Sequence, residues 1–228
     1  ATESLQRDEL RVYTRQIGDW RQDFFSKFRE GDVVEQRNEI HCPGFLEKPL
    51  VLEVDRSLAE AGSVFASALV MCNFFRDPQS CVAPILKNGR IVELGSGTGV
   101  LGIVLGLMGA DVLMTDLPHV QSQLERNTCR NVPSEMLNRV RVLSLPWGQY
   151  PDIDKADIVV CSDLVYVPAL YDDLVNTLLS LSTDSTVVVF SYETRRQANE
   201  QRFFDLVDQH FVVEDVTKAQ WRSEDVRV

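Results

Sequence analysis

The sequence of 228 residues has few of the residues that build metal or disulfide sites. It contains only three histidines, His41, His119 and His210, and five cysteines that are scattered without a C-x-x-C pair. Zinc sites need closely spaced Cys and His ligands, and disulfide frameworks use an even set of cysteines. The pattern therefore predicts no metal site and no disulfide framework, and it indicates a reducing, intracellular compartment.

Positive charge and long hydrophobic runs are also scarce. The chain has 23 Lys and Arg against 34 Asp and Glu, a net charge of -11. Because affinity for nucleic acid comes largely from clustered cations, this balance predicts no nucleic-acid partner, and an acidic surface favours a basic one. The uncharged stretch 94–110 contains six glycines and is shorter than the roughly 20 residues of a membrane span, so we expect no membrane helix there.

A regular alternation of apolar strands and helices begins at residue 90. The predicted strands are 90–94, 111–116, 140–145, 156–162, 185–192, 210–216 and 224–228, with helices near 100–109, 119–131, 168–182 and 196–210. Short, continuously apolar strands in this alternation are typical of a parallel sheet covered on both faces. We therefore predict an α/β, Rossmann-like fold with a seven-stranded, mostly parallel sheet and helices on both faces.

The part of the chain before residue 90 has a different pattern. Apolar residues recur at helical spacing over 13–28, alternate as in a strand over 50–54, and return to helical spacing over 57–75. We expect residues 1–45 to form an N-terminal helical or hairpin extension packed on the domain, and residues 46–228 to form the domain itself.

The stretch IVELGSGTGVLG, residues 91–102, follows a predicted strand and indicates close approach of the backbone to a ligand. Gly97, Gly99 and Gly102 satisfy G-x-G-x-x-G, which alone also suits a nicotinamide dinucleotide. Glu93 stands just before the loop, where a carboxylate disfavours a pyrophosphate and favours a ligand with an ammonium group. The alternative is a tight turn without a ligand. The sequence has no G-x-S-x-G or G-x-x-x-x-G-K-[ST] motif, so it lacks those hydrolase and NTPase signatures.

The spacing E-L-G-S-G-T-G resembles the cofactor loop of class I methyltransferases, which implies S-adenosyl-L-methionine as cofactor and S-adenosyl-L-homocysteine as product. By this resemblance Asp116 accepts hydrogen bonds from the ribose hydroxyls, and Trp147 lies near the adenine. The alternatives are a helix N-cap for Asp116 and a core position for Trp147. The residues expected to bind the cofactor are Phe65, Glu93, Gly95, Ser96, Gly97, Gly99, Asp116, Leu117, Trp147 and Ser162.

The motif S-D-L-V-Y, residues 162–166, resembles the Asp-x-x-Tyr signature of the family-16 protein methyltransferases, many of which act on lysine. The resemblance implies that Asp163 orients the lysine amine and that Tyr166 and Tyr192 form walls of a lysine channel. The alternative for Asp163 is a helix N-cap. The stretches S-Y-E-T-R, residues 191–195, and W-R-S-E-D-V-R-V, residues 221–228, resemble the valosin-containing-protein lysine methyltransferase branch of that family.

The resemblance covers roughly residues 50–228, with one departure: Phe65 and Ala66 stand where the family usually carries a Trp-Asp pair. The resemblance implies a protein-lysine methyltransferase whose substrate is a protein such as an AAA-type ATPase or a chaperone. It also implies a monomeric enzyme in the cytoplasm and the nucleus. No nucleic acid and no membrane are expected as partners. The alternatives are a small-molecule methyltransferase of the same fold, a nicotinamide-dependent oxidoreductase, and a non-catalytic module that binds the cofactor or a partner.

Overall fold

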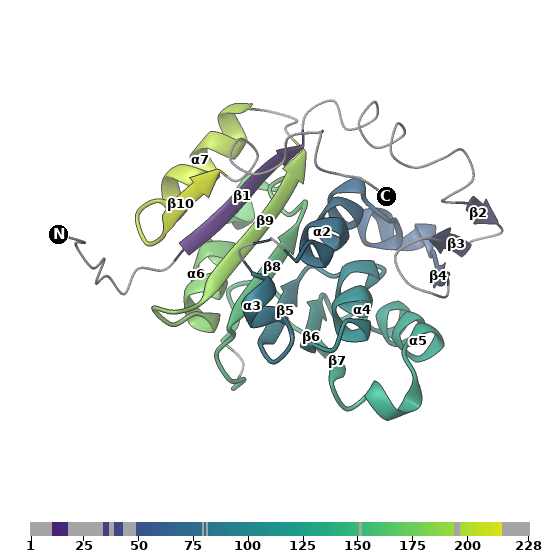
Figure 1. Cartoon of the computed structure of the whole chain (residues 1–228). Coiled ribbons are helices and arrows are strands. Elements are labelled where there is room, and N and C mark those ends of the chain that lie inside the picture. The colour runs from purple at the N-terminus through teal and green to yellow at the C-terminus, as the bar shows by residue number, and fades with distance from the viewer. Residues whose placement is uncertain are drawn as a thin grey trace, which may run out of the picture.

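Strands from residue 90 onward form most of the main sheet of the computed structural model (Figure 1). The structure describes residues 11–17, 34–36, 39–42, 49–78, 80, 82–150, 152–193 and 197–215. The strands predicted from residue 90 onward are present as β5 (Arg90–Leu94), β6 (Asp111–Asp116), β7 (Val140–Ser144), β8 (Ile158–Ser162), β9 (Val187–Glu193) and β10 (Val212–Asp215). The predicted strand at 224–228 and the motif at 221–228 lie outside the described residues.

The main sheet is parallel, in the order β10-β1-β9-β8-β5-β6-β7, where β1 is Arg11–Ile17. From β5 the chain moves outward through β6 to β7, and then returns to the other side of β5 as β8. The strand order therefore reverses between β5 and β8, which is where open α/β sheets bind ligands, beyond the carboxyl ends of the strands.

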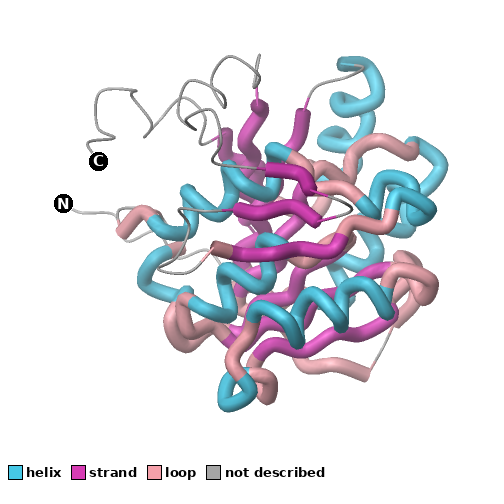
Figure 2. Tube along the Cα trace, turned by 90° about the vertical axis from the view of Figure 1, so that its right-hand side faces the viewer, coloured by secondary structure: helices cyan, strands magenta, loops and turns pink. Residues whose placement is uncertain are grey.

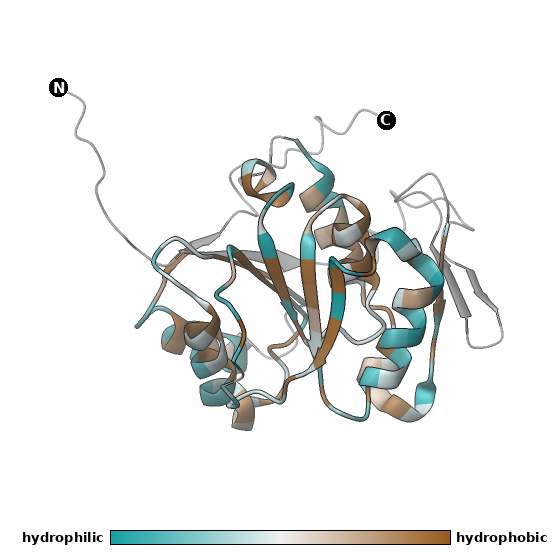
Figure 3. Ribbon diagram, turned by 90° about the horizontal axis from the view of Figure 1, so that it is seen from below, coloured by the Kyte–Doolittle hydropathy of each residue, from teal (hydrophilic) through white to brown (hydrophobic). Residues whose placement is uncertain are grey.

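Helices cover both faces of this sheet, as predicted (Figure 2). One hydrophobic cluster joins the sheet to α2 (Ala66–Arg76), α3 (Ala83–Leu86), α4 (Val100–Leu107) and α5 (Gln121–Asn131). A second joins it to α6 (Tyr171–Leu181) and α7 (Gln197–Val207). Short 3₁₀ helices are η1 (Arg56–Gly62), η2 (Ser134–Met136) and η3 (Pro168–Leu170). Figure 3 shows hydrophobic residues on the central strands and hydrophilic residues on the outer sides of the helices.

Side chains of β5 alternate between the two clusters. Ile91 lies in the cluster on the α4 side, and Val92 and Leu94 lie in the cluster on the α6 side. Because side chains of a strand point to opposite faces in turn, Glu93 points to the same face as Ile91, below α4. The alternation of side chains along β5 thus buries the Glu93 carboxyl under α4.

The predicted helix over 13–28 is wrong in its first part, because Arg11–Ile17 forms β1 and pairs with both β9 and β10. Four of its seven residues, Val12, Tyr13, Thr14 and Ile17, favour strands, and pairing on both edges outweighs the helical spacing. Residues 18–28 lie outside the described residues.

The strand predicted at 50–54 is confirmed as β4 (Leu50–Glu53), with alternating burial. It pairs antiparallel with β3 (Glu39–Cys42), which pairs with β2 (Val34–Gln36). The single helix predicted over 57–75 is wrong: η1 and α2 are separate, and Phe65 between them is extended.

In the described residues no single helix is long and apolar enough to span a membrane. One bent pair of helices, Arg56–Gly62 with Ser67–Arg76, has the length and the composition of a span when the two are taken together, and nothing beyond length and composition supports a span there.

Candidate cofactor and substrate site

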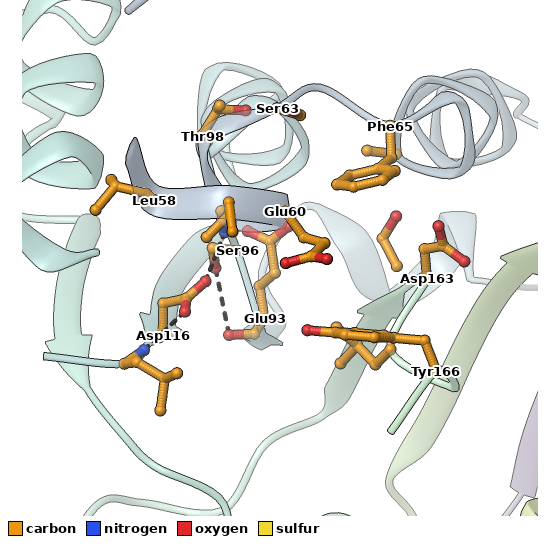
Figure 4. Close-up of a pocket in the computed structure, with 18 of the residues that line it drawn as sticks. Leu58, Glu60, Ser63, Phe65, Glu93, Ser96, Thr98, Asp116, Asp163 and Tyr166 are labelled. Atoms are coloured by element: carbon orange, nitrogen blue, oxygen red, sulfur yellow. Dashed lines mark hydrogen bonds between the residues drawn. The ribbon is translucent and has the colours of Figure 1, made fainter. Parts of the chain in front are cut away.

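A cavity of about 630 Å³ lies where the carboxyl ends of β5, β6 and β8 meet (Figure 4). Residues 58–61 contribute to its wall, and we name residues 55–62 the cover segment and residues 95–99 the glycine loop. Of the residues predicted for the site, those that line the cavity are Phe65, Glu93, Gly95, Ser96, Gly97, Asp116, Leu117, Trp147, Ser162, Asp163 and Tyr166.

The glycine loop makes its turn with positive φ at Gly95, Gly97 and Gly99. At Gly97, where φ is 53°, a Cβ atom would lie 3.3 Å from the carbonyl oxygen of Ala61. The cover segment therefore rests directly on the loop, and a side chain at Gly97 would be strained by its backbone angle and crowded by Ala61. Gly99 does not line the cavity; it is the N-cap residue of α4.

Glu93 brings a buried carboxyl to the wall of the cavity. Its side chain is 2% exposed, and its Oε2 has no hydrogen-bond partner. Burial raises the pKa of Glu93 to about 8, the nearby Asp116 adds to the effect, and the Ser96 hydroxyl and Gly102 N–H offset it in part. A buried acceptor without a partner is costly, so a ligand with a positively charged donor would be stabilised beside it.

Asp116 ties the end of β6 to the glycine loop. Its Oδ2 accepts a hydrogen bond from Gly97 N at 2.7 Å, and its Oδ1 accepts one from Leu117 N at 2.7 Å. Each carboxylate oxygen has a further lone pair, so the group can still accept hydrogen bonds from a diol. Burial raises the pKa of Asp116, while the two N–H groups act against that rise. The helix-cap alternative is wrong, because α5 begins at Gln121 with Val120 as its N-cap residue.

Two further residues close the cofactor side of the cavity. Trp147 is half-buried: it packs against the hydrophobic cluster of α6 and α7, and it also lines the cavity. Its position therefore agrees in part with the predicted place near the adenine and in part with the alternative of a core residue. Ser162, at the end of β8, lies with its Oγ 2.8 Å from the Oγ of Ser67 in α2. This contact holds the start of α2, and Phe65 before it, against the end of the sheet.

Asp163 follows β8 with φ of 60°, a left-handed conformation that few residues other than glycine adopt. Its N–H donates to Ser191 O at 2.7 Å, and its Oδ1 accepts a hydrogen bond from Glu193 N at 3.4 Å. Asp163 is therefore fixed from β9. The helix-cap alternative is wrong here too, because Leu170 is the N-cap residue of α6. Strained backbone of this kind is concentrated at functional sites.

Two aromatic rings line the cavity near Asp163. In the view of Figure 4 the rings of Phe65 and Tyr166 lie above and below a gap, with the Asp163 carboxyl to one side of it, and Tyr166 is 46% exposed. Tyr192 is not among the cavity-lining residues; its ring packs against Phe204 of α7, with centroids 5.0 Å apart. The structure thus brings Asp163 and Tyr166 together with Phe65, and places Tyr192 in a different contact.

Comparison with known proteins decides the family. A family model described as lysine methyltransferase matches residues 46–210. The chain belongs to this family. It is 33% identical over 162 residues to "Protein N-lysine methyltransferase METTL21A" of Xenopus tropicalis, covering 71% of this chain and 73% of that protein. It is 34% identical over 174 residues to "EEF1A lysine methyltransferase 3" of Mus musculus, covering 75% of this chain and 71% of that protein.

Family membership makes the chain a methyltransferase with S-adenosyl-L-methionine as its cofactor, and it sets aside the oxidoreductase alternative. The described residues fit this cofactor on physical grounds. Glu93 offers an unpartnered carboxyl oxygen to an ammonium group, Asp116 offers acceptors to a diol, and Trp147 offers a ring face to a base.

Two titratable residues of the cavity wall were missed by the sequence interpretation. Glu60 lies in η1 and lines the cavity, with its carboxylate close to Phe65 and Tyr166 in Figure 4. Its position was hidden by the prediction of one continuous helix. His119, which the sequence analysis considered only as a metal ligand, also lines the cavity. A signal was available for His119, since it follows the end of β6 by three residues.

Proposed function

We propose that this methyltransferase transfers a methyl group from S-adenosyl-L-methionine to the side chain of a lysine in a protein substrate. The observation that carries the proposal is that Asp163, Phe65 and Tyr166 line one cavity together with the glycine loop, Glu93 and Asp116, with the Asp163 carboxyl beside the gap between the two rings in Figure 4. Two aromatic rings and a carboxylate form a site for a long apolar side chain that ends in an amine.

The proposed mechanism depends mainly on positioning. The bound cofactor supplies a methyl group on a positively charged sulfur, ready for in-line displacement. A lysine amine must be neutral to attack, and transfer from water, where its pKa is near 10.4, into a partly apolar site next to a cation favours the neutral form. Asp163 accepts a hydrogen bond from the amine and so directs its lone pair, Phe65 and Tyr166 hold the alkyl chain, and water takes up the released proton.

The protein substrate is supported by the names of the relatives and by charge. The two curated relatives are named as methyltransferases of protein lysines, one of them of EEF1A. The net charge of -11, with Glu60 at the cavity, favours a basic target segment. The resemblance of residues 191–195 and 221–228 supports the narrower proposal of an AAA-type ATPase or chaperone as substrate, and of a monomeric enzyme in the cytoplasm and nucleus.

We also propose that residues 46–228 form the methyltransferase domain, that residues 1–45 extend it, and that its complete sheet has seven strands. The family match at 46–210 supports the domain. The pairing of β1 with β9 and β10 supports a contribution of the extension to the sheet. The role of Tyr192 as a channel wall stays a prediction, which Tyr192→Ala tests: a selective loss of activity toward protein would support it.

The test combines Asp163→Asn with labelled methyl donor. The purified enzyme is incubated with a cell lysate and isotopically labelled S-adenosyl-L-methionine, and new methyl-lysines are sought by mass spectrometry. We expect Asp163→Asn to lower labelling at least about 100-fold, with cofactor affinity by calorimetry within a few-fold of wild type. Asp172→Asn, in the exposed first turn of α6, is the matched control and should label normally.

Three results would count against parts of the proposal. Full activity of Asp163→Asn would reject the role of Asp163. Label that enters small metabolites and no protein would favour the small-molecule methyltransferase. Cofactor binding without any methylated product would favour the non-catalytic module.

A further inference from the structure

Helix α5 carries a row of amide side chains that no step of the proposed mechanism uses. Gln123, Asn127 and Asn131 are spaced four residues apart, so they lie on one face of the helix. This face meets the edge of β4 that β3 does not occupy. The amide oxygens accept hydrogen bonds from alternate backbone N–H groups: Asn131 from Val51 at 2.9 Å, Asn127 from Glu53 at 2.7 Å, and Gln123 from Asp55 at 2.7 Å.

The row replaces a neighbouring strand. Asn131 and Asn127 also donate through Nδ2 to the carbonyl oxygens of Val51 and Glu53, both at 3.0 Å, so each amide pairs with a strand residue as a peptide group would. Four helical residues rise about 6 Å, close to the roughly 6.7 Å covered by two strand residues. The two repeats therefore stay in register over the three contacts.

Two of the three amides also reach the walls of the cofactor cavity. Asn127 donates the second hydrogen of Nδ2 to Thr98 O of the glycine loop at 2.9 Å, and Gln123 donates through Nε2 to Ala61 O of the cover segment at 3.1 Å. Asn131 instead donates to Asn127 O within its own helix, at 2.8 Å. Both Thr98 and Ala61 line the cavity.

The hydrogen bonds from Gln123 and Asn127 reach two segments that contact each other, the cover segment and the glycine loop. The Ala61 carbonyl oxygen that accepts from Gln123 is also the atom that would lie nearest to a Cβ atom at Gly97, so the cover segment and the glycine loop meet there. Asn127 holds the next residue of that loop, Thr98, and is itself fully buried. A single helix face therefore sets the spacing between the cover segment and the loop.

We propose that Gln123 and Asn127 are positioning residues for cofactor binding, which hold the cover segment and the glycine loop at the separation that admits S-adenosyl-L-methionine. The inference rests on the proposed cofactor site in this cavity. Asn131 makes the same bonds to β4 without reaching the cavity, so it belongs to the fold and not to the positioning device.

The test uses three substitutions that preserve size and exchange the donating NH₂ for an acceptor oxygen. Gln123→Glu and Asn127→Asp each set a carboxyl oxygen against a carbonyl oxygen of the cavity wall. Asn131→Asp does the same against Asn127 O and Val51 O, away from the cavity, and is the matched control. Dissociation constants for S-adenosyl-L-homocysteine are measured by calorimetry on the full chain, with thermal unfolding recorded for each protein.

We expect Gln123→Glu and Asn127→Asp to raise the dissociation constant about tenfold or more, and Asn131→Asp to lower the melting temperature while binding within about twofold of wild type. Methyl incorporation at saturating cofactor should recover toward wild type in Gln123→Glu, because the reacting groups are untouched. If Asn127→Asp does not fold, Gln123→Glu alone decides.

Wild-type affinity in the folded Gln123→Glu protein would overturn the proposal, as would an equal loss of affinity in Asn131→Asp. Failure of the wild-type protein to bind the nucleoside would instead overturn the proposed function, so the two failures can be told apart.

Discussion

The substitution Glu93→Gln tests what the buried carboxyl below α4 contributes to stability. Burial, with a smaller contribution from Asp116, raises the pKa of Glu93 from 4.5 to about 8, so the carboxyl is protonated in the native protein at neutral pH. In the unfolded chain it is ionised above its ordinary pKa of 4.5. Folding therefore takes up a proton between pH 4.5 and 8, and the free energy of unfolding falls as the pH rises through that window.

One proton changes the free energy of unfolding by about 1.4 kcal/mol per pH unit, or about 5 kcal/mol across this window. Glutamine has the same size and does not titrate, so Glu93→Gln should lose this part of the slope and be the more stable protein at pH 8. Asp116, whose pKa burial also raises, titrates in both proteins. The difference between the two proteins, measured by urea unfolding at several pH values from 5 to 8, therefore isolates Glu93.

Cofactor binding gives a second way to measure the protonation of Glu93. A ligand that places a cation beside Glu93 favours the ionised carboxyl, so binding near neutral pH should release up to about one proton from wild type. Calorimetry in two buffers of different ionisation enthalpy measures that release, which Glu93→Gln should lack. If the unfolding slopes of the two proteins coincide, or if both release the same number of protons, Glu93 is ionised in the native protein and the reasoning is refuted.

Three further substitutions test other contacts. Gly97→Ala, at φ of 53° and 3.3 Å from Ala61 O, should cost about 1–2 kcal/mol and weaken cofactor binding about tenfold in calorimetry, and unchanged affinity would contradict the contact with the cover segment. Trp147→Ala should also weaken cofactor binding about tenfold, and a fall in melting temperature with no loss of affinity would assign it to the core alone. Arg126→Ala removes an exposed ion pair with Glu53 at 2.7 Å, so unfolding should change by less than about 1 kcal/mol and cofactor affinity should not change.

The centre of the fold was predictable because its signals are local. Strands β5, β6, β8 and β9 are short apolar runs, and strands buried on both faces need no partner to be recognised. The site at their ends follows from topology, because polar residues directly after parallel strands meet at one edge of the sheet. Asp116 is the last residue of β6 and Asp163 directly follows β8, and both line the cavity.

Two elements were predicted wrongly, one because of distant strand partners and one because of a local reversal of the chain. Residues 11–17 have helical spacing, but pairing with β9 and β10 on both sides outweighs it. The helix predicted over 57–75 breaks because the chain folds back on itself: a Cβ atom at Gly62 would lie 1.9 Å from Asp55 O. That glycine was the available signal for a break, and its cost in a helix interior argued for one.

The amide row of α5 shows why polar residues on a helix are the hardest part of such a site to predict. A helix with Gln123, Asn127 and Asn131 at intervals of four is normally interpreted as having one solvated polar face, and burial of amides without partners would be costly. Here Gln123 and Asn127 are buried, because the strand edge supplies a donor and the carbonyl oxygens accept from the amides in return. The shape of the cofactor cavity is thereby determined in part by α5, whose sequence has no cofactor motif. The contribution of α5 can be recognised only when the rise of the helix is compared with that of β4.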